Sequence, residues 1–183
     1  MRHAALLAAL AFALSLQAGC GDEDEPGFTI ASAAFGSNQP IPARHTCDGD
    51  PVPDISPPLA WARPPAATQS FTLIVDSRSG EFVNEPQVLW VVFNIPPGLT
   101  ELSENIGHRS DLPDGAKPGR NHEQKPEYKG PCPPTGEEYS YRHWLYALDT
   151  TLDIGYEPTA FQLREAMEGR VIDTAKLIGR YAR

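Results

Sequence analysis

The sequence predicts a mostly β fold, and three observations support this prediction. Short runs rich in β-branched and aromatic residues alternate with segments of Gly, Pro, Asn and Asp, the pattern of strands joined by turns. The 183 residues include 19 prolines and 15 glycines, which imply many ordered turns and disfavour a helical bundle. Hydrophobic residues make up 40% of the chain, so extensive disorder is not expected.

Four strands are expected from runs of β-branched and aromatic residues. The segments are residues 28–30, 71–75, 88–95 and 139–148. Residues 88–93 are apolar at every position, so this strand should be central and covered on both faces. In the last segment Tyr139, Tyr141 and His143 occupy every second position, so they should share one face of the strand.

Two helices are expected near the C-terminus, both as packing elements. Thr159 and Gln162 have the T-x-x-Q spacing of a capping box, and Gly169 can end the helix that follows. The apolar face of this helix would consist of Phe161, Leu163, Ala166 and Met167. A second, shorter helix over residues 171–178 would place Ile172, Ala175 and Ile178 on one side.

The N-terminus is typical of a secretory leader. A short basic start precedes an apolar run over residues 4–16, which is too short for a comfortable membrane span, and small residues precede Cys20. We therefore expect residues 1–19 to be a lipoprotein-type signal peptide and Cys20 to be lipidated, with simple cleavage after Ala18 as the alternative. Residues 20–27 would be an acidic tether, and residues 28–183 would form one domain.

This leader implies a protein of the cell envelope, anchored on the periplasmic side, or alternatively a secreted or soluble periplasmic protein. Without residues 1–19, 14 Lys and Arg stand against 24 Asp and Glu, a net charge of −10. Such a chain disfavours nucleic acid and an anionic bilayer as partners, so membrane contact is expected only through the anchor. The histidines lack metal-ligand spacing, and neither a metal nor a cofactor is expected.

The segment over residues 128–149 joins a proline-locked loop to the last predicted strand. In the run Gly130 to Pro134, three prolines fix the backbone and remove three amide donors, so the loop is shaped before any ligand arrives. The loop and one face of the strand could line a common cavity.

This segment resembles the phosphatidylethanolamine-binding protein family, in its bacterial YbhB/YbcL branch of Raf-kinase-inhibitor-like proteins. The matching residues are Gly119, Asn121, Tyr128, the run Gly130 to Pro134, Gly136 and the run Tyr146 to Asp149. Further matches are Thr46 to Gly49, Ser56 to Leu59 with Trp61, Ser70 and Phe71, Ile74 to Asp76, and Trp90 to Pro96. The resemblance implies a central antiparallel-rich β-sheet, a smaller sheet, C-terminal helices and a site for a phosphate-like head group.

The chain departs from the family at the implied ligand site. The family's D-P-D-x-P motif reads Asp76-Ser77-Arg78-Ser79-Gly80, which places an arginine where relatives carry a second acid. The two family histidine positions fall on Leu89 and, counted back from the run Tyr146 to Asp149, on Tyr139. The ligand-binding residues that the resemblance implies are Asp76, Arg78, Leu89, Gly130, Pro131, Cys132, Tyr139 and Tyr141.

The resemblance also places Cys47 and Cys132 in two loops on the same side of the pocket. In an oxidising compartment we favour a disulfide between them, with two separate thiols as the alternative.

Three functions follow from these residues. We favour a non-catalytic module that binds a small anionic ligand or phospholipid head group, with ligand choice altered by Arg78. The alternative is an interaction or inhibitor module that acts on an unidentified envelope protein. A Cys132-dependent hydrolase is the least favoured, because the prolines beside Cys132 leave no helix N-terminus to activate a thiolate.

Overall fold

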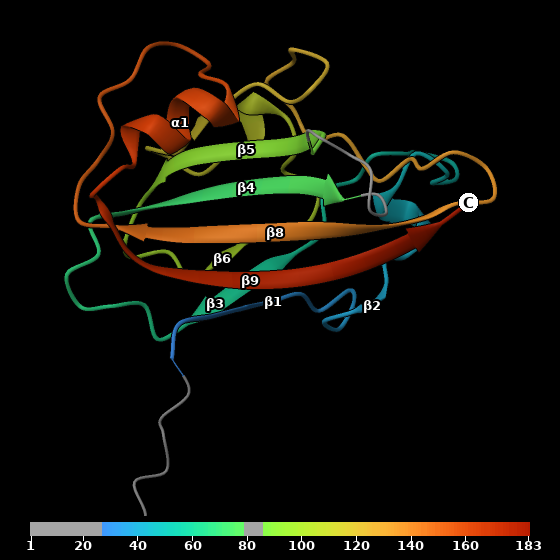
Figure 1. Cartoon of the computed structure of the whole chain (residues 1–183), viewed down its shortest axis with the longest axis horizontal. Coiled ribbons are helices and arrows are strands. Elements are labelled where there is room, and N and C mark those ends of the chain that lie inside the picture. The colour runs from blue at the N-terminus through green and yellow to red at the C-terminus, as the bar shows by residue number, and fades with distance from the viewer. Residues whose placement is uncertain (1–26, 79–85) are drawn as a thin grey trace, which may run out of the picture.

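The computed structural model describes residues 27–78 and 86–183 (Figure 1). The predicted leader, Cys20 and all of the acidic tether except Gly27 lie outside the described residues, as do Ser79 and Gly80. No helix among the described residues is both long enough and apolar enough to cross a membrane.

Two β-sheets make up most of the domain. The strands are β1 (Thr29–Ala31), β2 (Gln39–Pro40), β3 (Leu59–Ala62), β4 (Ser70–Arg78), β5 (Val88–Ile95), β6 (Glu101–Leu102), β7 (Lys117–Pro118), β8 (Glu138–Leu148) and β9 (Val171–Ala182). The larger sheet has the order β2-β9-β8-β4-β5-β7, and the smaller has the order β1-β3-β6. All pairs are antiparallel except β2 with β9. The mostly β prediction with two sheets is confirmed.

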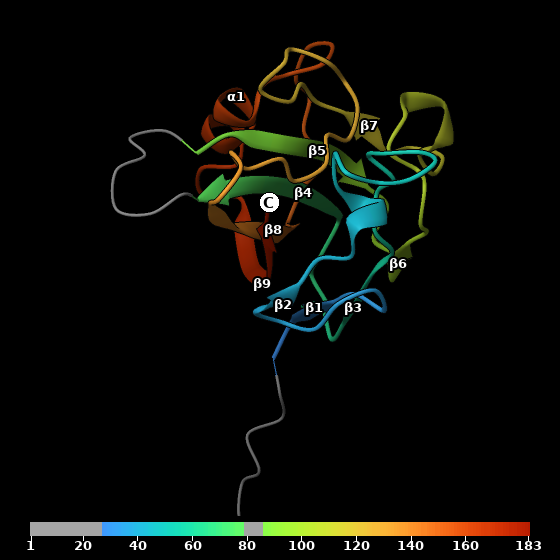
Figure 2. The same cartoon turned by 90° about the vertical axis from the view of Figure 1, so that its right-hand side faces the viewer.

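The larger sheet is the middle of three layers (Figure 2). The smaller sheet covers one face, where Phe28 and Trp61 pack against Phe71 of β4. Helix α1 (Ala160–Ala166) covers part of the other face, where Leu163 packs in a second core with residues of β4 and β5. Consequently β5 is buried on both faces, as its apolar run predicts.

The helix begins where the capping box predicts. The Thr159 side chain accepts a hydrogen bond from the Gln162 amide, and the Gln162 side chain accepts one from the Thr159 amide. Leu163 and Met167 are buried, but Phe161, which we expected on the same apolar face, is 69% exposed.

The second predicted helix is wrong, because residues 171–182 form strand β9. This strand pairs with β8 from Leu148 back to Glu138. Ala175, Leu177 and Gly179 are buried at every second position, which is strand periodicity. Within the described residues α1 is therefore the one α-helix, and the C-terminal helices of the prediction reduce to one.

Candidate functional site

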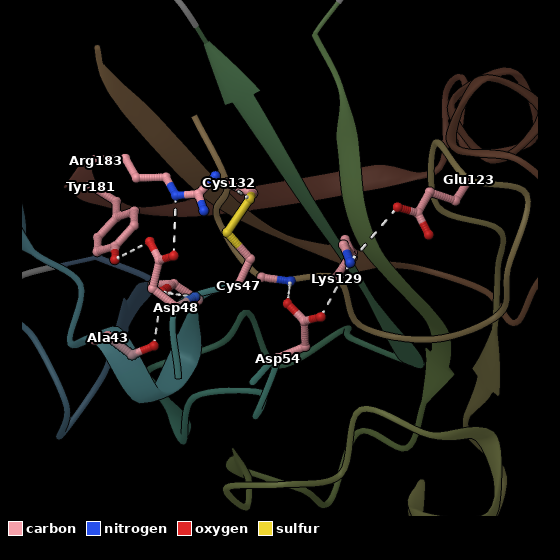
Figure 3. The surroundings of a disulfide bond; sticks show 11 residues. Ala43, Cys47, Asp48, Asp54, Glu123, Lys129, Cys132, Tyr181 and Arg183 are labelled. Atoms are coloured by element: carbon pink, nitrogen blue, oxygen red, sulfur yellow. Dashed lines mark hydrogen bonds and ion pairs between the residues drawn. A yellow bond between two sulfur atoms is a disulfide. The ribbon is translucent and has the colours of Figure 1, made fainter. Parts of the chain in front are cut away.

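A disulfide joins the proline-rich loop to the loop before β3 (Figure 3). Cys47 and Cys132 are bonded, with their Cα atoms 5.4 Å apart, and the bond spans 85 residues of sequence. The amide of Cys47 also donates to the carbonyl of Pro131, at 3.1 Å. The predicted pairing of these two cysteines is confirmed.

Asp54 fixes the start of the proline-rich loop. Its Oδ1 accepts from the Gly130 amide at 2.8 Å, and its Oδ2 accepts from Nζ of Lys129 at 3.2 Å (Figure 3). A Cβ atom at Gly130 would lie 2.7 Å from Cα of Thr46, so only glycine fits here. The loop is thus held by contacts within the protein itself.

Two buried tyrosines support the same loop. The hydroxyl of Tyr128 donates to the His45 carbonyl at 2.7 Å, and Tyr141 hydrogen-bonds the Cys132 backbone. Burial raises the pKa of both tyrosines, so both hydroxyls remain protonated at neutral pH. Leu89 lies in the core beside them, and its carbonyl accepts from the Lys129 amide at 3.0 Å.

The end of β9 covers this corner from outside. Asp48 accepts hydrogen bonds from the hydroxyl of Tyr181 at 2.8 Å and from Nε of Arg183 at 3.1 Å (Figure 3). The Arg183 side chain also lies 3.6 Å from Sγ of Cys132. The predicted loop residues Gly130, Pro131 and Cys132 therefore form a braced corner together with Leu89 and Tyr141.

Asp76 lies on the opposite face of the larger sheet. A register irregularity separates Val75 from Asp76 in the pairing of β4 with β5, and Asp76 pairs with Arg142 across β8. Its carboxylate is 1% exposed and accepts from Nε of Arg142 at 2.7 Å and from a terminal amine of Arg164 in α1 at 3.1 Å. Asp76 therefore faces α1, whereas Tyr128 and Tyr141, which support the Gly130 loop, pack in the core on the other face.

Neither of these arginines is among the site residues predicted from the sequence. The signal for Arg142 was present, because it alternates with Tyr141 along the strand and must face the other way. The contact of Arg164 with Asp76 spans 88 residues of sequence, and no local pattern indicates it.

Arg78 ends β4 beside two small cavities. One, of about 220 Å³, is lined by Ser77, Arg78, Pro86 and Arg142. The other, of about 300 Å³, brings Arg78 together with Tyr139 and is completed by Asn38, Glu138, Ser140, Ile178 and Arg180. The predicted site is thus divided: Arg78 and Tyr139 meet at the strand end, while the loop residues and Tyr141 pack inside.

Metal chemistry gains no support from the described residues. Residues 27–78 and 86–183 contain no group of three His, Cys, Asp or Glu side chains placed to hold a metal ion. His143 is buried and packs against Phe35, with the ring centres 5.5 Å apart.

Comparison with known proteins gives a consistent result. The family model for phosphatidylethanolamine-binding protein matches residues 31–182. A UPF0098 protein of Methanothermobacter thermautotrophicus is 44% identical over 155 residues, which cover 84% of this chain and 98% of the relative. A UPF0098 protein of Pyrococcus horikoshii is 37% identical over 182 residues, covering 95% and 87%.

Two crystal structures are similar along most of their length. The phosphatidylethanolamine-binding protein homologue CT736 of Chlamydia trachomatis aligns with a TM-score of 0.74 and 33% identity, covering 86% of this chain and 98% of the homologue. YbcL of E. coli, described as a member of the mammalian PEBP family, aligns with a TM-score of 0.78 and 26% identity, covering 86% and 99%.

Proposed function

The chain belongs to the phosphatidylethanolamine-binding protein family, and from this premise we propose that it is a non-catalytic binding protein of the cell envelope. Its ligand is a small anion, such as a phosphate-bearing head group, held between Arg78 and Arg142. The observation that carries the proposal is the cavity of about 220 Å³ lined by both arginines. This volume suits a single phosphate or carboxylate group better than a drug-sized ligand.

Asp76 prepares Arg142 for this role. The carboxylate engages Nε of Arg142 at 2.7 Å, which leaves the terminal amines as the donors that can reach the cavity. A guanidinium held in this way loses little rotamer freedom on binding, and its planar donors match phosphate or carboxylate oxygens. Arg142 is 20% exposed, so its charge is only partly screened by water.

The charge distribution supports an anionic ligand. No Asp or Glu is among the described residues that line this cavity, although the whole chain carries a net charge of −9. Arg78 is exposed at the strand end, and its position corresponds to the second acid of the D-P-D-x-P motif. Arg78 therefore puts a positive charge where the family resemblance implies a negative one.

Two further features support binding without catalysis at the envelope. The disulfide removes the Cys132 thiolate that a hydrolase would need, because a disulfide sulfur is not a free nucleophile. The leader-like residues 1–19 favour export, and export provides the oxidising compartment in which this disulfide persists.

Titration of the mature protein with phosphoethanolamine and inorganic phosphate tests the proposal. Removing Arg78 deletes one charge-assisted contact worth about 1.5 kcal/mol or more, so Arg78→Ala should weaken binding by about tenfold or more. The control is Arg170→Ala, which removes an exposed arginine outside the cavity and should leave affinity unchanged. Equal affinities for the original protein and Arg78→Ala would overturn the role of Arg78.

A further inference from the structure

A second cavity lies on the α1 face of the larger sheet, beyond the proposed anion site. It has a volume of about 600 Å³ and is walled by three segments: the start of β5, the turn after β7 and the first turns of α1. The lining residues are Pro86, Val88, Arg120, Asn121, His122, Gln124, Thr159, Ala160, Phe161 and Arg164. This volume is typical of sites for small organic ligands.

Two arginines give the cavity its positive charge. Arg120 and Arg164 line it, and the described lining residues include no Asp or Glu. Asp76 orients the Arg164 side chain, because one terminal NH2 group of its guanidinium donates to the buried Asp76 carboxylate at 3.1 Å. Arg120 lies 3.8 Å from a carboxylate oxygen of Glu157, which offsets part of its charge from outside the lining. The donors of Arg164 that Asp76 does not engage are available to an anionic group.

Phe161 is the unusual member of this lining. Its side chain is 69% exposed, although it stands on a helix whose other face is packed into a core by Leu163. The core does not require Phe161, and an exposed phenyl ring beside two arginines presents a stacking surface next to anion donors.

His122 and Asn121 keep the opposite wall in place. Nδ1 of His122 lies 2.8 Å from the Val88 carbonyl and donates to it, which fixes the ring. Asn121 is buried, and its side-chain oxygen accepts from the amides of Glu123 and Lys125 at 2.9 and 3.0 Å. The wall opposite Phe161 is therefore a preformed turn.

We infer that this cavity binds a small aromatic anion, with its ring stacked on Phe161 and its phosphate or carboxylate group on Arg164 and Arg120. The site adjoins the Arg78 cavity, because Pro86 lines both and Asp76 contacts an arginine of each. A ligand with only the ring would lack the contacts with Arg164 and Arg120, and a ligand with only the charge would lack the contact with Phe161.

NMR titration in an Arg78→Ala background tests this inference, because that background weakens the first anion site. The probes are phenyl phosphate, benzoate, inorganic phosphate and phenol. The ring should add about five- to tenfold in affinity, so phenyl phosphate should bind more tightly than inorganic phosphate. The comparison of phenyl phosphate with benzoate tells which anionic group the arginines prefer.

Variants with matched controls complete the test. Phe161→Ala should remove the advantage of phenyl phosphate over phosphate, whereas Tyr156→Ala, which removes another exposed ring, should not. Arg164→Gln should weaken phenyl phosphate by about tenfold or more, and Arg170→Gln should have no effect. No binding of phenyl phosphate, no advantage over phosphate, or an equal loss in Tyr156→Ala would overturn the inference.

Discussion

Asp76 is a buried carboxylate shared by two arginines of different elements. An isolated ion at 1% exposure would be costly, and the two charge-assisted hydrogen bonds offset that cost. Arg142 also lies over the ring of Trp144, with 5.7 Å from its guanidinium carbon to the ring centre. Strand alternation puts Asp76 on the same face as Ile74, but the sequence alone does not show that this face is the one that α1 covers.

His143 gives the molecule a stability that depends on pH. Burial lowers its pKa to about 4, below the 6.5 of an exposed histidine. Above pH 6.5 the His143 side chain is neutral in both the native and the unfolded state, so burying it costs no stability through deprotonation. As the pH falls from 6.5 toward 4, His143 binds a proton in the unfolded chain but stays neutral in the native state. The free energy of unfolding should therefore fall by up to about 3 kcal/mol. Urea unfolding across this range measures the loss.

The variant His143→Phe separates this contribution from other titrations. It keeps an aromatic ring against Phe35 and cannot bind a proton, so the loss between pH 6.5 and 4 should become smaller. Some dependence should remain, because burial also lowers the pKa of His45. An unchanged slope in His143→Phe would contradict the assignment.

Strand β9 shows why local pattern can mislead at the scale of an element. Ile172, Ala175 and Ile178 have helical spacing, yet Ala175, Leu177 and Gly179 also fit a strand. Pairing with β8 along its whole length selects the strand period over the helical one. Because β8 is distant in the sequence, the local pattern of residues 171–182 does not reveal this pairing. Helix α1 could be predicted, because its capping box is contained in four consecutive residues.

Gly179 tests how tightly β9 is packed. A Cβ atom there would lie 2.5 Å from Cγ1 of Ile41 and 2.9 Å from Cε2 of Phe35, closer than van der Waals contact allows. Gly179→Ala should therefore lower the free energy of unfolding by about 1–3 kcal/mol in urea. Gly98→Ala is the control, because no atom lies within 4 Å of its added Cβ, and it should be neutral within about 0.5 kcal/mol. Similar effects of both substitutions would refute the packing argument.

At the scale of the whole molecule, the larger sheet separates two groups of the predicted site residues. Ser77 pairs with Tyr141, and Asp76 pairs with Arg142, so neighbouring positions of β4 face opposite layers. The family resemblance that the motifs carry implied the two sheets and brought the two cysteines to one side of the pocket, and the oxidising compartment favoured the disulfide. The assembly of the site depends on register and on contacts of α1, which the motifs do not encode.

The disulfide between Cys47 and Cys132 should contribute substantially to the free energy of unfolding. It closes a loop of 85 residues, which includes β3, β4 and β5. Closing a loop of this length destabilises the unfolded chain by about 4.6 kcal/mol in the chain-entropy account, so Cys47→Ala/Cys132→Ala should lower the free energy of unfolding by about 2–5 kcal/mol. Reduction of the original protein should reproduce this loss in urea unfolding, and reduction should leave the double variant unchanged. If reduction left the original protein as stable as before, the proline-rich loop would be held by its hydrogen bonds, such as those of Asp54 with Gly130 and Lys129, and not by the disulfide.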